Sequence, residues 1–226
     1  LQGRPKLRLV SRMLFELTVV LIGVFLAIRL EAWAEERAQR HEALATLEAL
    51  RSELEGDRAE LSAVSDHQVE FASGLRRLAD LLSDDPAAHQ AEIHTLITED
   101  LTPNPTWFPQ SAAYHTLVST GQVVALDNTD LQVQLARLYE RSYSRLVYNG
   151  ELYDQAFLEE FRWAVTEHWD YRAEQLLSTS RAENWTLANV AMRLATWSDA
   201  YLNVLAEYAP QMDGTLVSVE QELDGR

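Results

Sequence analysis

The sequence predicts an all-α protein in which a single transmembrane helix continues into a long helix of a four- to five-helix bundle outside the membrane. Glycine (8) and proline (6) are scarce among 226 residues, which favours long helices. An apolar segment lies near the N-terminus, and beyond it apolar residues recur at helical spacing. We expect a basic segment over residues 1–12, a membrane anchor over 13–34 and an acidic helical bundle over 35–226.

The apolar segment is short for a membrane anchor. Its uncharged part, Leu17–Ile28, has twelve residues, about 18 Å of helix against a hydrocarbon core of about 30 Å. A core helix or the apolar region of a signal peptide has a similar length, and Ala32-Trp33-Ala34 resembles a cleavage site. The helical pattern passes this point without a turn-forming residue, however, and 14–34 gives twenty-one residues. We therefore expect a retained anchor. Its expected membrane residues are Leu17, Val20, Leu21, Val24, Phe25, Ile28 and Trp33.

Charge is distributed unevenly along the chain. Residues 1–40 contain seven Lys and Arg and four Glu, whereas 41–226 contain twelve Lys and Arg and thirty-one Asp and Glu. Positive charge before the anchor predicts a cytoplasmic N-terminus; in a bacterium this means an inner (cytoplasmic) membrane protein with its bulk in the periplasm. Phosphate backbones repel a body this acidic, so we expect no nucleic-acid partner.

Two ionisable residues near the ends of the anchor are candidate partner contacts. Glu16 is either an interfacial residue paired with Arg12, one turn earlier, or a contact to another subunit inside the membrane. Arg29 lies near the other end, where its guanidinium can extend to the headgroups.

After the anchor an apolar residue recurs with a seven-residue period for more than five heptads. The repeat runs through Ala43, Leu47, Leu50, Leu54, Asp57, Leu61, Val64, Gln68, Phe71, Leu75, Leu78 and Leu82, with Asp57 and Gln68 as exceptions. Such a seam forms either a coiled coil between subunits or one face of a bundle within the chain, and the sequence leaves both open. The helix is expected to end at Ser83-Asp84-Asp85-Pro86.

A short helix over 87–98 is expected next, followed by a loop with three prolines between Pro103 and Pro109. Trp107 and Phe108 in this loop either plug the end of the bundle or form a contact patch for a partner. These two aromatic residues complete the candidate partner contacts.

Two helices are expected on either side of a short connection. The first covers 111–119 and ends at Gly121, which suits the left-handed geometry of a helix C-terminus. The connection, 122–126, is the one fragment with β character. The second helix begins at the capping residues 127–130 and runs to about residue 171, with a weak point at Asn149-Gly150.

The last helix is expected to start near 183–184, with Pro210 kinking or interrupting it before a final turn or two. In the preceding helix, aromatic and acidic residues alternate between 157 and 172. They suggest a carboxylate site, but a core stripe explains them more simply, because the apolar members step by four. The stripe is Phe157, Phe161, Val165 and Trp169.

Two stretches resemble an uncharacterised bacterial family of single-pass membrane proteins. The first resembles an anchor of the pattern Gly-Glu-Ile-x-Leu-Val-x-Ile-Gly, and its matching residues are Glu16, Ile22, Gly23, Ala27, Trp33 and Glu35. The second matches at Leu117, Thr120, Gly121, Asn128, Leu131 and Tyr139. Phe15 and Ala34 depart from the pattern, and no match is seen after about residue 145. The resemblance implies an N-terminus inside the cell and an exported helical domain, and it implies no activity.

No motif for catalysis, a metal or a cofactor is present. The chain has no cysteine, which excludes thiolate chemistry. His89 and His94 are five apart, a poor spacing for one helix face. No glycine-rich phosphate loop and no Gly-x-Ser-x-Gly occurs. We therefore expect no enzymatic activity, no metal and no cofactor, and rank an enzyme using scattered carboxylates last.

Two functional hypotheses follow. The first is a non-enzymatic membrane-anchored interaction or scaffold protein, an accessory subunit of a larger membrane complex. Its partners would be the lipid bilayer and other subunits, or a second copy through the Ala43–Leu82 seam. The alternative is a sensor-like periplasmic bundle that binds a ligand and signals through a partner. The partner would be needed because the chain is expected to have almost no cytoplasmic part.

Overall fold

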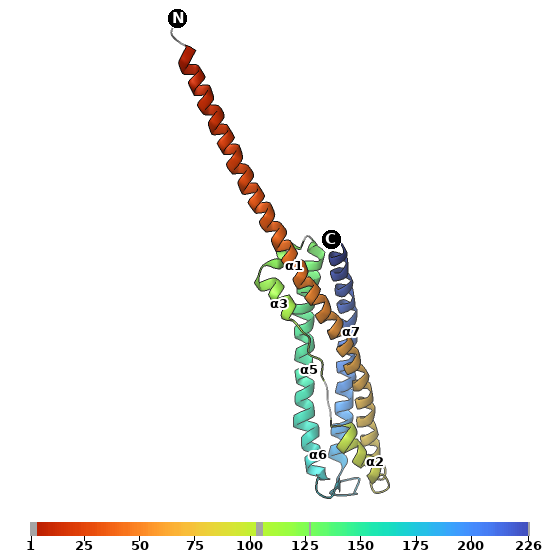
Figure 1. Ribbon diagram of the computed structural model, residues 1–226. Coiled ribbons are helices and arrows are strands. Elements are labelled where there is room, and N and C mark those ends of the chain that lie inside the picture. The colour runs from red at the N-terminus through yellow and green to blue at the C-terminus, as the bar shows by residue number, and fades with distance from the viewer. Residues whose placement is uncertain (1–3, 103–105, 127, 226) are drawn as a thin grey trace.

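The computed structural model describes the backbone of residues 4–102, 106–126 and 128–225, and side chains from residue 16 onward. The protein is nearly all-α, as the sequence predicts. One long helix, α1 (Arg4–Ser83), projects from a bundle (Figure 1). The C-terminus and α3 lie at the end of the bundle where α1 enters, and α2 and α6 lie at the opposite end (Figure 1).

Helix α1 is a single unbroken helix of 80 residues. Its second half packs against the antiparallel helix α7 (Trp185–Asp224) (Figure 1). Every residue of the seven-residue repeat is buried in this single chain, including the exceptions Asp57 and Gln68. The structure thus shows the second alternative for the seam, a face of a bundle within the chain.

A third series of helical segments, called the third rod, runs along the bundle beside α1 and α7. It consists of α4 (Thr129–Ala136), the π-helical segment η3 (Arg137–Tyr143), α5 (Ser144–Ala156), the π-helical segment η4 (Phe157–Phe161) and α6 (Arg162–His168). The predicted core stripe is confirmed, because all four of its residues are buried. The rod ends three residues before the predicted boundary, where β1 (Trp169–Asp170) pairs antiparallel with β2 (Gln175–Leu176). No pattern in the sequence indicated this hairpin.

The fourth side of the bundle consists of short helical segments and an extended strap. It is made by α2 (Gln90–Thr95), the π-helical segment η1 (Leu96–Asp100), a non-helical strap over 106–111, α3 (Ala112–Ser119) and the 3-10 turn η2 (Gln122–Ala125). The fragment with predicted β character is therefore a 3-10 turn. Pro103 of the predicted loop lies outside the described residues.

The predicted helix boundaries around this corner are confirmed. Gly121 adopts the left-handed conformation with φ 73°, which costs glycine least. Asn128 caps α4, because its side-chain oxygen accepts a hydrogen bond from the Leu131 N–H at 3.0 Å. Asp127, another predicted capping residue, lies outside the described residues.

Two predicted interruptions do not occur. Helix α7 continues past Pro210 to Asp224, well beyond the predicted turn or two. Pro210 is exposed, so the backbone carbonyl that loses its partner can face water. Helix α5 also continues through Gly150, which is buried where the strap crosses. A side-chain carbon at position 150 would lie 3.5 Å from the Tyr201 hydroxyl and 3.7 Å from Cβ of Thr106.

Candidate functional site

The predicted membrane residues form an uncovered apolar surface on α1. The seven side chains from Leu17 to Trp33 are each between 53% and 61% exposed, and none packs on the bundle. Among the described residues α1 is the one helix long and apolar enough to cross a membrane. A continuous apolar surface of this size requires lipid or protein to cover it.

The two ionisable residues of this segment lie on the exposed helix. The Arg29 guanidinium lies over the Phe25 ring, 5.2 Å from its centroid, so it points back along the helix and away from the bundle. Arg37 covers Trp33 in the same way at 5.4 Å. Glu16 is exposed, and the side chain of Arg12, its predicted partner, lies outside the described part.

The aromatic pair in the strap is divided between core and surface. Trp107 is completely buried and Phe108 is 46% exposed. The Trp107 indole N–H donates to the Asp57 carbonyl oxygen at 3.1 Å, and the Trp107 backbone N–H donates to the Tyr201 hydroxyl at 2.9 Å. Trp107 is therefore a core residue in the middle of the bundle. It neither plugs the bundle's end nor belongs to a contact patch, which leaves Phe108 as the surface candidate.

Asp57 is the centre of a polar network in the core. Its Oδ1 accepts the Gln110 backbone N–H at 2.9 Å, and its Oδ2 accepts the Tyr143 hydroxyl at 3.2 Å. One turn earlier on α1, both carboxylate oxygens of Glu53 accept the Ala113 backbone N–H at 3.1 Å. The two carboxylates therefore bind the strap and the first turn of α3 to α1.

Burial changes the protonation of this network. Desolvation raises the pKa of Asp57 to about 6, although the hydrogen bonds from Gln110 and Tyr143 act in the opposite direction. Burial also raises the pKa of Tyr114 to about 12 and the pKa values of Tyr139 and Tyr143 further. The phenols therefore stay protonated at neutral pH, and Tyr143 donates its hydrogen bond to a carboxyl group with a pKa of about 6.

Three tyrosines continue the network toward the surface. The rings of Tyr114 and Tyr139 stack with centroids 4.3 Å apart, and Tyr143 meets Tyr139 edge-on at 4.8 Å. The buried Tyr139 hydroxyl has no hydrogen-bond partner among the described residues. A cavity of about 410 Å³ opens beside these rings. Its other lining residues are Pro109, Ser111, His115, Glu140, Ser144 and Val147.

The π-helical segment η3 explains how this rod presents so many side chains to the core. Leu138 and Tyr139 are neighbours in sequence and both are buried, and the same holds for Ser142 and Tyr143. A π-helix widens the turn and shifts the register by one residue, so adjacent positions can face the same way. The sequence contained no signal for this shift. The one signal for the network was a carboxylate at a seam position, which required buried partners.

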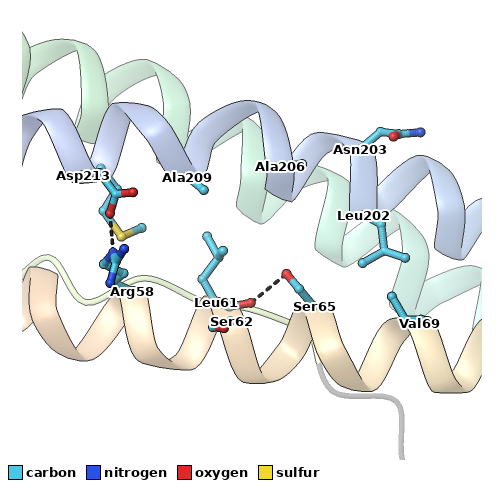
Figure 2. A pocket seen from close by; sticks show the side chains of 11 residues that line it. Arg58, Leu61, Ser62, Ser65, Val69, Leu202, Asn203, Ala206, Ala209 and Asp213 are labelled. Atoms are coloured by element: carbon cyan, nitrogen blue, oxygen red, sulfur yellow. Dashed lines mark hydrogen bonds and ion pairs between the residues drawn. The ribbon is translucent and has the colours of Figure 1, made fainter.

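A second hollow lies between α1 and α7 (Figure 2). It measures about 500 Å³, and a salt bridge between Arg58 and Asp213 stands at one end. The remaining lining side chains are mostly apolar or small: Leu61, Ser62, Ser65, Val69, Leu202, Asn203, Ala206, Ala209 and Met212. We call this hollow the α1–α7 groove.

The described part of the chain holds no group of three His, Asp or Glu side chains able to bind a metal ion. His94 instead contacts Glu174 at the tip of the hairpin, with 3.3 Å between Nε2 and Oε2.

Comparison with known families identified a family to which this chain is similar. A family model described as a family of unknown function (DUF6090) matches residues 16–189. The predicted uncharacterised family is therefore confirmed, and the match extends beyond the predicted limit near residue 145, through the third rod and into the start of α7. Comparisons with curated proteins and with solved structures found no match.

Proposed function

The chain belongs to the DUF6090 family of unknown function, and we propose that it is a non-enzymatic, membrane-anchored interaction protein, an accessory subunit of a larger membrane complex. One observation carries this proposal. The same unbroken helix, α1, presents the exposed apolar segment and supplies the buried seam of the bundle. A bundle attached in this way has a fixed height and rotation relative to its anchor.

The geometry of α1 supports a rigid attachment. Between Ala34 and Ala43 the helix is mostly exposed, and nine residues correspond to about 14 Å of helix. A flexible linker would let the bundle move freely, whereas a helix transmits the orientation of the anchor to the bundle. Such rigidity suits a protein that contacts one partner both inside and outside the membrane.

The location is part of the same proposal. The basic residues before the anchor favour a cytoplasmic N-terminus, which in a bacterium places the bundle on the periplasmic side of the inner membrane. Lipid would cover most of the apolar surface of the anchor. We propose Glu16 and Arg29 as contacts to a neighbouring subunit, because ionisable side chains in membranes usually face protein.

The test is extraction of native membranes with a mild detergent, followed by native mass measurement and identification of the co-migrating proteins. We expect a complex larger than one copy of this chain that contains another membrane protein. Glu16→Leu and Arg29→Leu should each reduce the yield of that complex. Glu36→Leu, which changes an exposed residue just beyond the anchor, is the matched control. A lone monomer from wild-type membranes would contradict the proposal.

The cavity beside Tyr139 favours a second candidate, a sensor-like bundle that binds a small ligand and signals through a partner. Its volume of about 410 Å³ is in the range of small-molecule sites. The buried Tyr139 hydroxyl, which has no partner in the described chain, could donate to a ligand. Native mass measurement would reveal a retained small molecule, and its addition to the emptied protein should raise the melting temperature. The absence of both effects would contradict this candidate.

A further inference from the structure

We propose that the α1–α7 groove is the docking site for an amphipathic helix of a partner protein, with Lys and Arg beside the apolar stripe of that helix. This inference rests on the proposed interaction function and names the surface that performs it. It concerns the bundle, and it does not depend on Glu16 or Arg29.

The groove has the dimensions of a helix site. The Arg58–Asp213 salt bridge crosses it at one end, and the Arg76–Asp199 salt bridge joins the same two helices farther from the membrane anchor. The residues of α1 that line the groove run from Arg58 to Val69, a separation of 11 residues that corresponds to about 17 Å, or three turns of helix.

The lining residues allow close approach of another helix. Ala206 and Ala209 on α7 and Ser62 and Ser65 on α1 are small, so a helix backbone can come near without displacing large side chains. Val69 is 57% exposed at the groove and offers apolar surface to a partner. Figure 2 shows these residues between the two helices, with the third rod behind them. A helix in the groove would therefore pack against α1 and α7 on the side away from the third rod.

Charge selects the occupant. Asp66 and Glu207 are exposed and directly follow lining residues, Ser65 and Ala206, along their helices. One residue corresponds to a rotation of about 100°, so each carboxylate lies a little more than a quarter turn around its helix from a residue that lines the groove. Residues 41–226 also carry thirty-one acidic against twelve basic side chains. A basic helix is attracted to this surface, whereas a second copy of the acidic bundle is repelled.

Lipid does not fit as the occupant. Arg58, at the membrane-proximal end of the groove, lies 24 residues beyond Ala34 on the same helix. That separation corresponds to about 36 Å of α1, which exceeds the depth of the headgroup layer. A helix that reaches the groove must therefore come from the part of a partner that lies outside the membrane.

The test uses the full chain in native membranes, with a photoreactive phenylalanine in place of Ala206. The control carries the same group in place of Leu158, which is 60% exposed on the third rod. After illumination, the cross-linked peptide is sequenced. We expect a peptide of another protein, with an apolar helical stripe and flanking Lys or Arg, from position 206 and not from position 158.

Charge reversal completes the test. Asp66→Lys together with Glu207→Lys should lower the cross-link yield about tenfold, whereas Asp66→Asn with Glu207→Gln should lower it less. Equal melting temperatures would show that the variants are folded. A cross-link to this same chain, to lipid or to an acidic peptide would overturn the inference. So would an intact complex without a cross-link at 206, although the proposed function would stand. If wild-type membranes contain no such complex, both this inference and the proposed function are overturned.

Discussion

Replacing Asp57 with Asn should stabilise the protein at neutral pH and remove part of its pH dependence. The asparagine oxygen can still accept the Gln110 backbone N–H, which lies 2.9 Å from the aspartate oxygen. Its amide nitrogen replaces the oxygen that accepts the Tyr143 hydroxyl at 3.2 Å, so that hydrogen bond must reverse its direction. The substitution thus keeps the shape of the network and removes its charge.

The magnitude follows from the pKa of Asp57, which burial raises from 3.8 to about 6. A carboxyl group whose pKa is higher in the folded state binds more protons there than in the unfolded state. The free energy of unfolding therefore falls as pH rises between about 4 and 6. A shift of this size corresponds to about 3 kcal/mol. Reversing the Tyr143 hydrogen bond costs about 1 kcal/mol, so the expected gain at pH 7 is about 2 kcal/mol.

The assay is urea unfolding of the full chain in detergent at pH values from 4 to 8, for wild type and Asp57→Asn. The difference in unfolding free energy between the two proteins should change by about 2.4 kcal/mol between pH 4 and pH 7. Asp66→Asn, at an exposed position on the same helix, controls for the loss of one negative charge. If the two unfolding curves stay parallel across this pH range, Asp57 does not titrate as burial requires and the reasoning is wrong.

Substitutions at three further positions test the strap and the corner by the same unfolding assay. Trp107→Ala should lower the free energy of unfolding by about 3–5 kcal/mol because a large buried side chain is lost. Trp107→Phe should lower it less, because this change mainly removes the 3.1 Å hydrogen bond to the Asp57 carbonyl oxygen. Equal losses for the two variants would contradict the core position of Trp107. Gly150→Ala should leave the stability unchanged or raise it by up to about 1 kcal/mol, because the nearest atom, the Tyr201 hydroxyl, would lie at an ordinary 3.5 Å from the new carbon. The larger side chain of Gly150→Leu should displace the strap and destabilise the protein. Equal stability of the two variants would refute this packing. Asn128→Ala should cost about 1 kcal/mol by removing the cap of α4, and no loss would show that the cap contributes nothing.

The spacing of apolar residues predicted the long helices well, because a helix that buries one face against a single neighbour carries apolar residues at regular intervals. Helix α7 covers one face of α1 from Ala43 to Leu82, so the seven-residue repeat persists over that whole length. The same spacing is required by a coiled coil between subunits. The pattern therefore predicted the buried face, and only the presence of α7 in the same chain determined what covers it.

The polar centre could not be predicted, because its contacts are distant in sequence. Asp57 binds Gln110 and Tyr143, which lie 53 and 86 residues further along the chain. The prolines around Trp107 indicated an exposed loop, yet the strap occupies the side of the bundle where a fourth helix would stand. The β-hairpin has two residues in each strand, too few to produce a visible alternation.

The residues that resemble the family pattern account for the corner of the fold. Leu117 and Leu131 are fully buried, Gly121 supplies the left-handed turn and Asn128 caps the next helix. They start the third rod at a defined place, and its π-helical segment then brings Tyr143 to Asp57.

Docking in the α1–α7 groove would leave no comparable sequence pattern. The groove depends on small side chains at helical spacing, together with the salt bridges of Arg58 and Arg76 to α7. Alanine and serine at such positions are common in any helix, so no motif distinguishes them.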